Sequence, residues 1–183
     1  ATLIFYRDQQ PFIIASAYKF LLTPEKAVSE AADVTIYLDG DSIFNSGVAL
    51  SYVSGDKKLS LINGSKRNYY SPYTNTYHNL DMYCENITWD IPGDKLDISM
   101  LRQQGTQSYS SFESSDYYSL QKYLDIQGID QISPLQKVYR YMKNRQSNEF
   151  YIDEFAQFIK MDLIQAKLMI HNLAKAGLLT FNE

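Results

Sequence analysis

Five acidic residues lie close together in the sequence, and two carboxylates within one site could hydrolyse a glycosidic bond. They are Asp81, Glu85, Asp90, Asp94 and Asp97. A glycosidase holds two carboxyl groups about 5 to 10 Å apart, one as the acid and the other as the nucleophile or base. Acids that alternate along a half-buried strand are also an ordinary solvated face. The spacing pairs no two of these residues, so we favour the solvated face and expect no enzymatic activity.

Other residues could bind a metal ion, but their spacing does not match a known ligand pattern. Residues 39–42 (Asp-Gly-Asp-Ser) resemble the start of a calcium loop, yet the twelfth position holds Leu50 instead of the required glutamate. His78 and His171 lie far apart, without a metal-binding spacing. Cys84 is the only cysteine, which excludes an internal disulfide and a multi-cysteine zinc site. We therefore expect no metal and no cofactor, and a small buried hydrophobe at Cys84.

Tyrosine is the most distinctive residue type, with 16 among 183 residues, and it is densest in one segment. Asparagines are interleaved with these tyrosines, a combination typical of adaptable binding surfaces. Aromatic rings of this kind could also stack on sugars. Alternatively, the rings fill a small sheet core while their hydroxyls stay hydrated, and we favour this alternative. The candidate interaction residues in this segment are Tyr69, Tyr70, Tyr73 and Tyr77.

Composition places the chain among globular proteins. It is 45% hydrophobic and 21% charged, with a net charge of −4. These values exclude a disordered tail, and no apolar run approaches the ~18 residues of a membrane span. Residues 134–183 carry seven Lys or Arg and five Asp or Glu, whereas residues 1–133 carry ten and sixteen. An acidic first part and a weakly basic second part have little electrostatic attraction to a polyanion, so we do not favour nucleic-acid binding.

Residues 1–110 have the pattern of a mainly antiparallel β region. Short alternating runs are separated by turn residues, and Asp39-Gly40 is a strong hairpin signal. Asn45-Ser46-Gly47 predicts a further turn, and residues 106–116 a polar connection. The strand candidates are residues 3–7, 11–22, 33–38, 43–44, 48–53, 58–62, 80–91 and 95–101.

Residues 111–183 predict helices, so the fold class is α+β. A helix over 117–127 ends at Gly128, and Ser133 with Pro134 begins a second that reaches residue 143. Asp153 is expected to cap a third and Asp162 a fourth, which ends near Gly177. Short strands are expected at 150–152 and 178–181.

This order of elements is similar to a winged helix-turn-helix domain, mainly over residues 151–156, 160–162 and 173–179. A DNA-reading helix needs polar and basic side chains toward the groove. Leu168 and Met169 are expected to point outward there, and they suit neither phosphates nor most base edges. We expect this apolar face to be covered by the β region or by another chain.

Several other stretches resemble a family of large Bacteroidetes cell-envelope proteins. They are residues 34–42, 71–73, 77–83, 112–114 and 134–135. The resemblance supplies no activity and no functional residues. It implies a module of a longer, strand-rich protein in the cell envelope or periplasm, whose partners are other modules of the same chain or another protein. The start at Ala1 within a strand also suggests a fragment, and a cytoplasmic location stays open.

The leading hypothesis is therefore a non-catalytic structural or protein-interaction module of a larger envelope protein. One alternative is a nucleic-acid-binding winged-helix module that uses Lys167 and Lys175. Another is a carbohydrate-binding or carbohydrate-processing domain that uses the tyrosine-rich segment and the nearby acids.

Overall fold

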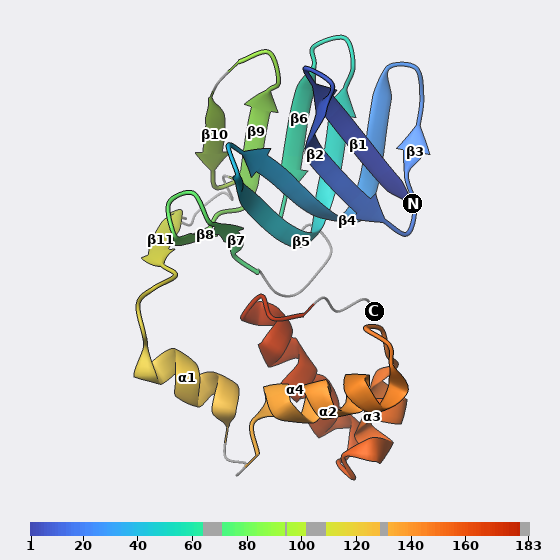
Figure 1. Ribbon diagram of the computed structural model, residues 1–183, viewed down its shortest axis with the longest axis vertical. Coiled ribbons are helices and arrows are strands. Elements are labelled where there is room, and N and C mark those ends of the chain that lie inside the picture. Colours follow the sequence, from blue (N-terminus) through green and yellow to red (C-terminus); the bar gives the residue numbers. More distant parts are fainter. Residues whose placement is uncertain (64–70, 94, 102–108, 129–131, 180–183) are drawn as a thin grey trace. The chain divides into compact units, whose positions relative to one another are not determined.

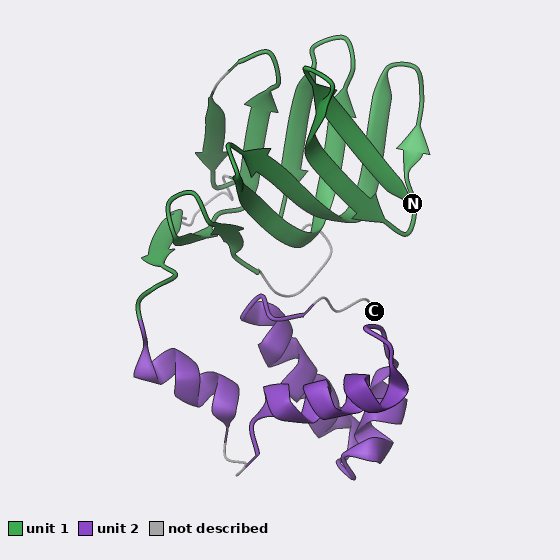
Figure 2. Ribbon diagram, viewed as in Figure 1, with its two compact units in different colours: residues 1–117 green, residues 118–183 purple. Residues whose placement is uncertain are grey.

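The computed structural model describes residues 1–63, 71–93, 95–101, 109–128 and 132–179. A large antiparallel sheet is followed by four helices, which confirms the α+β class (Figure 1). The chain forms two compact units, Ala1–Tyr117 and Tyr118–Glu183 (Figure 2). The division lies later than the expected boundary at residue 110, because a strand over Ser111–Ser114 pairs with the sheet.

The described residues of the β unit form eleven strands, and every pairing between these strands is antiparallel. Two of them, β4 and β5, are 13 residues long and form one hairpin. The strands are β1 (Thr2–Arg7), β2 (Gln10–Ala17), β3 (Leu21–Leu22), β4 (Lys26–Leu38), β5 (Asp41–Val53), β6 (Lys58–Ile62), β7 (Tyr73–Asn75), β8 (Leu80–Tyr83), β9 (Asn86–Asp90), β10 (Leu96–Ser99) and β11 (Ser111–Ser114).

The long hairpin is bent, and its two halves have different neighbours. The first half of β4 pairs with β3 and the second with β2, whereas the first half of β5 pairs with β7 and the second with β6. Register shifts in the β4–β5 pairing mark the bend, and β5 passes through it at Gly47 with φ of +70°. A bulge bends a strand and increases its twist. The predicted turn at Asn45-Ser46-Gly47 is therefore wrong, since these residues form a bulge inside one continuous strand.

The bend folds the sheet into two facing layers joined by β4 and β5. Figure 1 shows β1 and β2 crossing in front of β6. The rings of Phe5 and Tyr52 meet edge to face at 4.9 Å between centroids, and those of Phe12 and Trp89 at 5.7 Å. Each pair joins a residue of β1 or β2 to one of β5 or β9, so the buried faces of the two layers share one apolar core.

The hairpin prediction at Asp39-Gly40 is confirmed. Leu38 pairs with Asp41, and the two turn residues have positive φ, +46° at Asp39 and +97° at Gly40. Positive φ at both positions is the type I′ geometry that Asp-Gly favours. Two other strand predictions were too long: residues 11–22 contain β2 and β3, and residues 80–91 contain β8 and β9.

The part of the second unit that the structure describes contains four helices. Their bounds are α1 (Leu120–Gln127), α2 (Pro134–Arg145), α3 (Ile152–Phe158) and α4 (Leu163–Lys175). The Asp162 carboxylate caps α4 by accepting the N–H of Ile164 over 2.9 Å, as predicted. Asp153 lies in the first turn of α3 instead of capping it, because the helix already begins at Ile152.

The helical unit has its own core around Tyr141 and Phe155, with Val138, Ile170 and Leu173. The helices expected in this part of the chain are present. The two strands expected beside them do not form over the described residues: 150 and 151 are irregular, and 178 and 179 follow a turn.

Candidate functional site

An apolar cavity opens between the two layers of the β unit. Its volume is about 380 Å³, which lies within the ~300–1,000 Å³ typical of small-molecule sites. It occupies the end of the unit where β7, β8 and β11 continue one layer and β9 and β10 continue the other. The lining side chains are Leu38, Asp39, Ile43, Asn75, Tyr77, His78, Leu80, Met82, Trp89, Leu96, Ile98 and Phe112.

The bend in β5 explains why the layers separate here. Before the bulge, Ile43 pairs with Asn75 of β7, and after it Leu50 pairs with Leu61 of β6. The strands beyond β7 and β6 therefore belong to different layers and leave space between their inward side chains. Ile43, Met82 and Trp89 form the buried floor, while Phe112 is half exposed at the opening.

Asn75 places a polar group inside this apolar cavity. Its side chain is only 5% exposed, and its Oδ1 accepts the backbone N–H of His78 over 3.2 Å. That bond directs the amide nitrogen, Nδ2, toward Met82, whose Sδ lies 3.7 Å away. A thioether is a weak acceptor, and Nδ2 carries two N–H groups. The Asn75 amide nitrogen is therefore a hydrogen-bond donor inside the cavity whose only acceptor among the described residues is a weak one.

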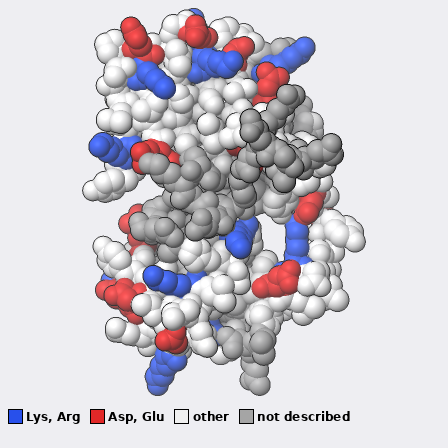
Figure 3. Space-filling view, turned by 180° about the vertical axis from the view of Figure 1, so that it is seen from behind, with Lys and Arg blue, Asp and Glu red and all other residues white. Residues whose placement is uncertain are grey.

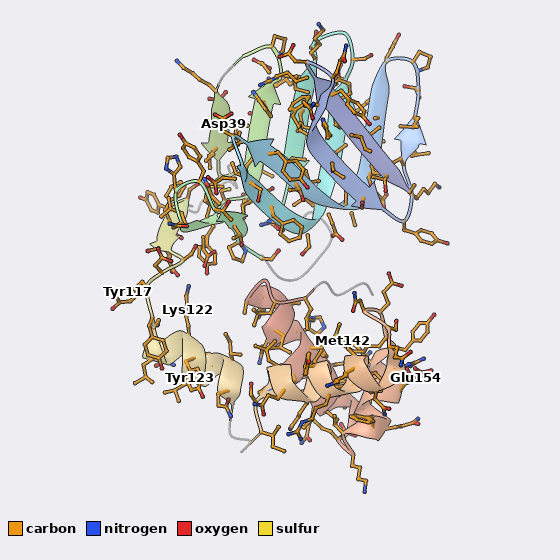
Figure 4. The ribbon with its side chains drawn as sticks, viewed as in Figure 1. Asp39, Tyr117, Lys122, Tyr123, Met142 and Glu154 are labelled. Atoms are coloured by element: carbon orange, nitrogen blue, oxygen red, sulfur yellow. The ribbon has the colours of Figure 1, made fainter. Side chains whose placement is uncertain are left out.

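The rim of the cavity comes from two turns held together by Thr76. The Thr76 hydroxyl contacts Asp41, and its backbone N–H donates to the Ser42 carbonyl over 2.9 Å. Asp39, at the tip of the β4–β5 hairpin (Figure 4), and Tyr77, which directly follows Thr76, both line the cavity. The Tyr77 ring meets His78 edge to face at 4.8 Å and is 54% exposed. The rim is therefore aromatic and contains a single carboxylate among the described lining residues.

The predicted tyrosine residues have different environments. Tyr77 lines the cavity, whereas Tyr73 is 1% exposed in the core, with its hydroxyl 3.4 Å from the carbonyl oxygen of Leu61. Burial, followed by the nearby Cys84, raises the pKa of Tyr73 above its ordinary range. Tyr69 and Tyr70 lie outside the described residues. The segment therefore contributes both to the core and to the rim of the cavity.

Three of the five predicted acidic residues, Asp81, Glu85 and Asp90, have separate partners. The Asp81 carboxylate accepts from the Ser115 hydroxyl, and Asp90 lies 3.9 Å from the Lys58 ammonium. Buried Glu85 accepts the backbone N–H of Leu101 over 2.7 Å. Asp94 lies outside the described residues. Among the residues that the structure describes, no group of three or more His, Cys, Asp or Glu could hold a metal ion.

A second candidate is the outward face of α4, the helix that was compared in the sequence analysis with a DNA-reading helix. Ile164 is 77% exposed and Leu168 is 63% exposed. They are four residues apart and therefore share one face of the helix; with Leu163 they form what we term the α4 apolar face. Met169, expected to lie outward with Leu168, is instead half buried against the helical core. Ile164 was not among the predicted interaction residues, although its spacing from Leu168 was a usable signal.

Figure 3 shows no continuous basic groove among the described residues on this face of the molecule. There, the Lys and Arg side chains of the described residues lie among Asp and Glu side chains instead of forming one continuous patch. None of the helices that the structure describes is both long and apolar enough to cross a membrane.

The cavity offers apolar walls and one amide donor, and the α4 apolar face offers exposed aliphatic side chains. The chain has no significant match to any protein-family model, curated protein or solved structure.

Proposed function

We propose that this chain is a non-catalytic protein-interaction module of a larger envelope protein, and that it binds its partner through the α4 apolar face. The observation that carries this proposal is the exposure of Ile164 and Leu168 on one face of a helix whose opposite face is fully packed. Burying one such side chain contributes about 1.5 to 3 kcal/mol, so two neighbouring ones can anchor a partner.

The residues around this face favour a protein partner over DNA. Gln165 and Lys167 are exposed polar residues between Ile164 and Leu168, but the α4 apolar face itself is entirely aliphatic. A groove-reading helix would place hydrogen-bonding side chains there. The partner is therefore expected to present an apolar surface, either from another module of the same longer chain or from a separate protein.

The proposal can be tested with a photo-crosslinking residue in the full-length protein in its own cells. Benzoylphenylalanine at Ile164 should form a covalent adduct with a protein segment, identified by mass spectrometry. Lys143, exposed on α2, is the matched position for background. Leu168→Asp should reduce the Ile164 adduct at least tenfold, because it places a charge in the apolar contact.

Two results would count against this function. Adducts at Ile164 no more abundant than at Lys143 would remove the α4 apolar face as the contact. Tight binding of duplex DNA at low salt, weakened by Lys167→Gln or Lys175→Gln, would favour the nucleic-acid alternative. Fractionation of the same cells tests the envelope location, since a chain recovered only with cytoplasmic proteins contradicts it.

A further inference from the structure

We propose that the cavity of the β unit is a binding site for a small neutral molecule that is mostly apolar and has one hydrogen-bond acceptor. This site is separate from the α4 apolar face and uses different residues. Its walls, its volume, the amide of Asn75 and the charge at its rim each restrict the ligand.

The walls determine the main character of the ligand. Aliphatic side chains dominate them, together with Met82, Trp89 and Phe112. The indole N–H of Trp89 already donates to the Gly93 carbonyl over 2.9 Å, so this ring offers the cavity only its apolar surface. Sugar sites need several hydrogen-bonding groups around the ligand, whereas Asp39, Tyr77 and His78 are exposed and, besides this tryptophan, Asn75 is the one buried hydrogen-bonding side chain of the described lining. The walls therefore favour a hydrocarbon or aromatic body.

The volume sets the size of the ligand. An engineered protein cavity of roughly 150 Å³ lined by similar side chains holds one benzene ring. At about 380 Å³, this cavity has room for a bicyclic aromatic molecule or a short branched chain.

Asn75 determines which polar group the ligand needs. Its Oδ1 is occupied by the His78 N–H, which leaves Nδ2 as the group available to a ligand. The 3.7 Å contact with Met82 satisfies one N–H weakly, and the second N–H has no partner among the described residues. A buried donor without a strong acceptor is costly, and a ligand carbonyl or ether oxygen would relieve that cost. A ligand with such an oxygen should therefore bind more tightly than its plain hydrocarbon analogue.

The charges around the cavity favour an uncharged ligand. Asp39 is the one carboxylate on the described lining and lies at the opening, where it disfavours an anion. The floor is apolar, so a cation bound there would lie away from the charge of Asp39 and would be poorly stabilised. A neutral acceptor satisfies both constraints.

The test uses 6-propionyl-2-dimethylaminonaphthalene, a neutral bicyclic ketone whose fluorescence shifts to the blue in apolar surroundings. Trp89 is the sole tryptophan of the chain and lines the cavity, so bound probe should also quench tryptophan emission. We expect saturable binding of one probe per chain. We also expect the ketone to bind about 2- to 10-fold more tightly than 2-dimethylaminonaphthalene, which lacks the carbonyl, in line with one ordinary hydrogen bond.

Two variants and a control locate the probe. Ile98→Phe, at a half-buried position of β10, should fill the cavity and weaken binding at least tenfold. Asn75→Ala should abolish the preference for the ketone while still binding the hydrocarbon. Leu22→Phe adds a ring to the exposed edge strand β3, outside the cavity lining, and should bind as the unaltered chain does. Circular dichroism and melting temperature verify that each variant is folded.

The proposal is overturned if the unaltered chain shows no saturable quenching, or if Ile98→Phe binds the probe as tightly as Leu22→Phe. Equal affinity for ketone and hydrocarbon in the unaltered chain would overturn the role of Asn75. Should Asn75→Ala fail to fold, this ligand comparison in the unaltered chain decides the role of the amide alone.

Discussion

The hydroxyl of Thr76 donates a hydrogen bond to a carboxylate oxygen of Asp41 over 3.0 Å, and the same hydroxyl oxygen accepts the backbone N–H of Ser42 over 2.8 Å. Asp41 and Ser42 begin β5, whereas Thr76 directly follows β7. One side chain thus connects the β4–β5 hairpin to the turn that carries Tyr77 and His78. This connection holds together the two sides of the cavity rim.

Thr76→Val should weaken both the β unit and the cavity. The substitution keeps the branched shape suited to an extended backbone but removes the hydroxyl, leaving the Ser42 N–H to solvent. We expect a loss of about 0.5 to 1.5 kcal/mol in the free energy of unfolding, measured with urea, and weaker binding of the naphthyl ketone. Thr74→Val is the control, because the exposed Thr74 hydroxyl has no partner among the described residues. Equal effects of the two substitutions would contradict a specific role for Thr76.

Ser71→Ala should be more disruptive, because it breaks a buried polar cluster. The Ser71 hydroxyl donates to Asn45 Oδ1 over 2.8 Å, while its carbonyl accepts from Asn45 and from Asn63. Removing the hydroxyl leaves a buried acceptor without this donor, which costs about 1 to 3 kcal/mol. Ser46→Ala is the control, since Ser46 is half buried and makes no side-chain hydrogen bond with described residues. A urea midpoint shifted no further by Ser71→Ala than by Ser46→Ala would show that the cluster contributes little.

Local signals in the sequence predicted the elements whose causes are local. Asp39-Gly40 sets its own turn, and Asp162 caps the helix that follows it, so neither needs information from distant residues. The bulge at Gly47 is different. The same three residues can turn the chain or bend a strand, and the pairing of β4 with the whole of β5 decides the outcome. β7 and β11 were missed because they are short and depend on pairing with β8.

The cavity could not be predicted for the same reason. Its lining comes from both layers, and only the register beyond the bend brings Asn75 and Ile98 to one space. The sequence did mark Tyr77, but as one of several equivalent tyrosines, since burial of Tyr73 depends on the fold. At α4, Met169 was predicted to point outward with Leu168, but adjacent residues lie on different faces of a helix, and Met169 packs against the helical core.

Stability of the β unit should fall at alkaline pH because of Cys84. Burial raises the pKa of this thiol from its usual value near 9 to about 12. Above about pH 9 the unfolded chain releases the proton while the folded chain retains it, so the free energy of unfolding decreases until about pH 12. The raised pKa of Tyr73 acts in the same direction. Urea unfolding at about pH 8 and about pH 10.5 measures the decline.

Cys84→Ala separates the contribution of the thiol from that of Tyr73. This variant should lose less stability over the same pH interval, whatever its stability at neutral pH, because one of the two linked protons is gone. The comparison is therefore the slope with pH and not the midpoint itself. Identical slopes for the variant and the unaltered chain would show that Cys84 does not cause the pH dependence.

Tyr141→Phe tests the polar contact that closes the helical core. The Tyr141 ring packs among Phe150, Phe155 and Phe158, while its hydroxyl accepts a hydrogen bond from Arg145 over 2.9 Å. Arg145 also forms an ion pair with Glu154 of α3. Phe keeps the aromatic packing and removes only the hydroxyl, so we expect a loss of about 0.5 to 1.5 kcal/mol in thermal or urea unfolding of the helical unit.

Tyr139→Phe is the matched control for this substitution, because Tyr139 lies on the same helix with an exposed ring and no hydrogen bond to described residues. It should change stability by no more than about 0.5 kcal/mol. Added salt should narrow the difference between the two variants if the charge of Arg145 strengthens the contact, since salt screens exposed charges. If Tyr141→Phe proves as stable as Tyr139→Phe at every salt concentration, the aromatic packing alone holds α2 against α3, and the hydroxyl contributes nothing measurable.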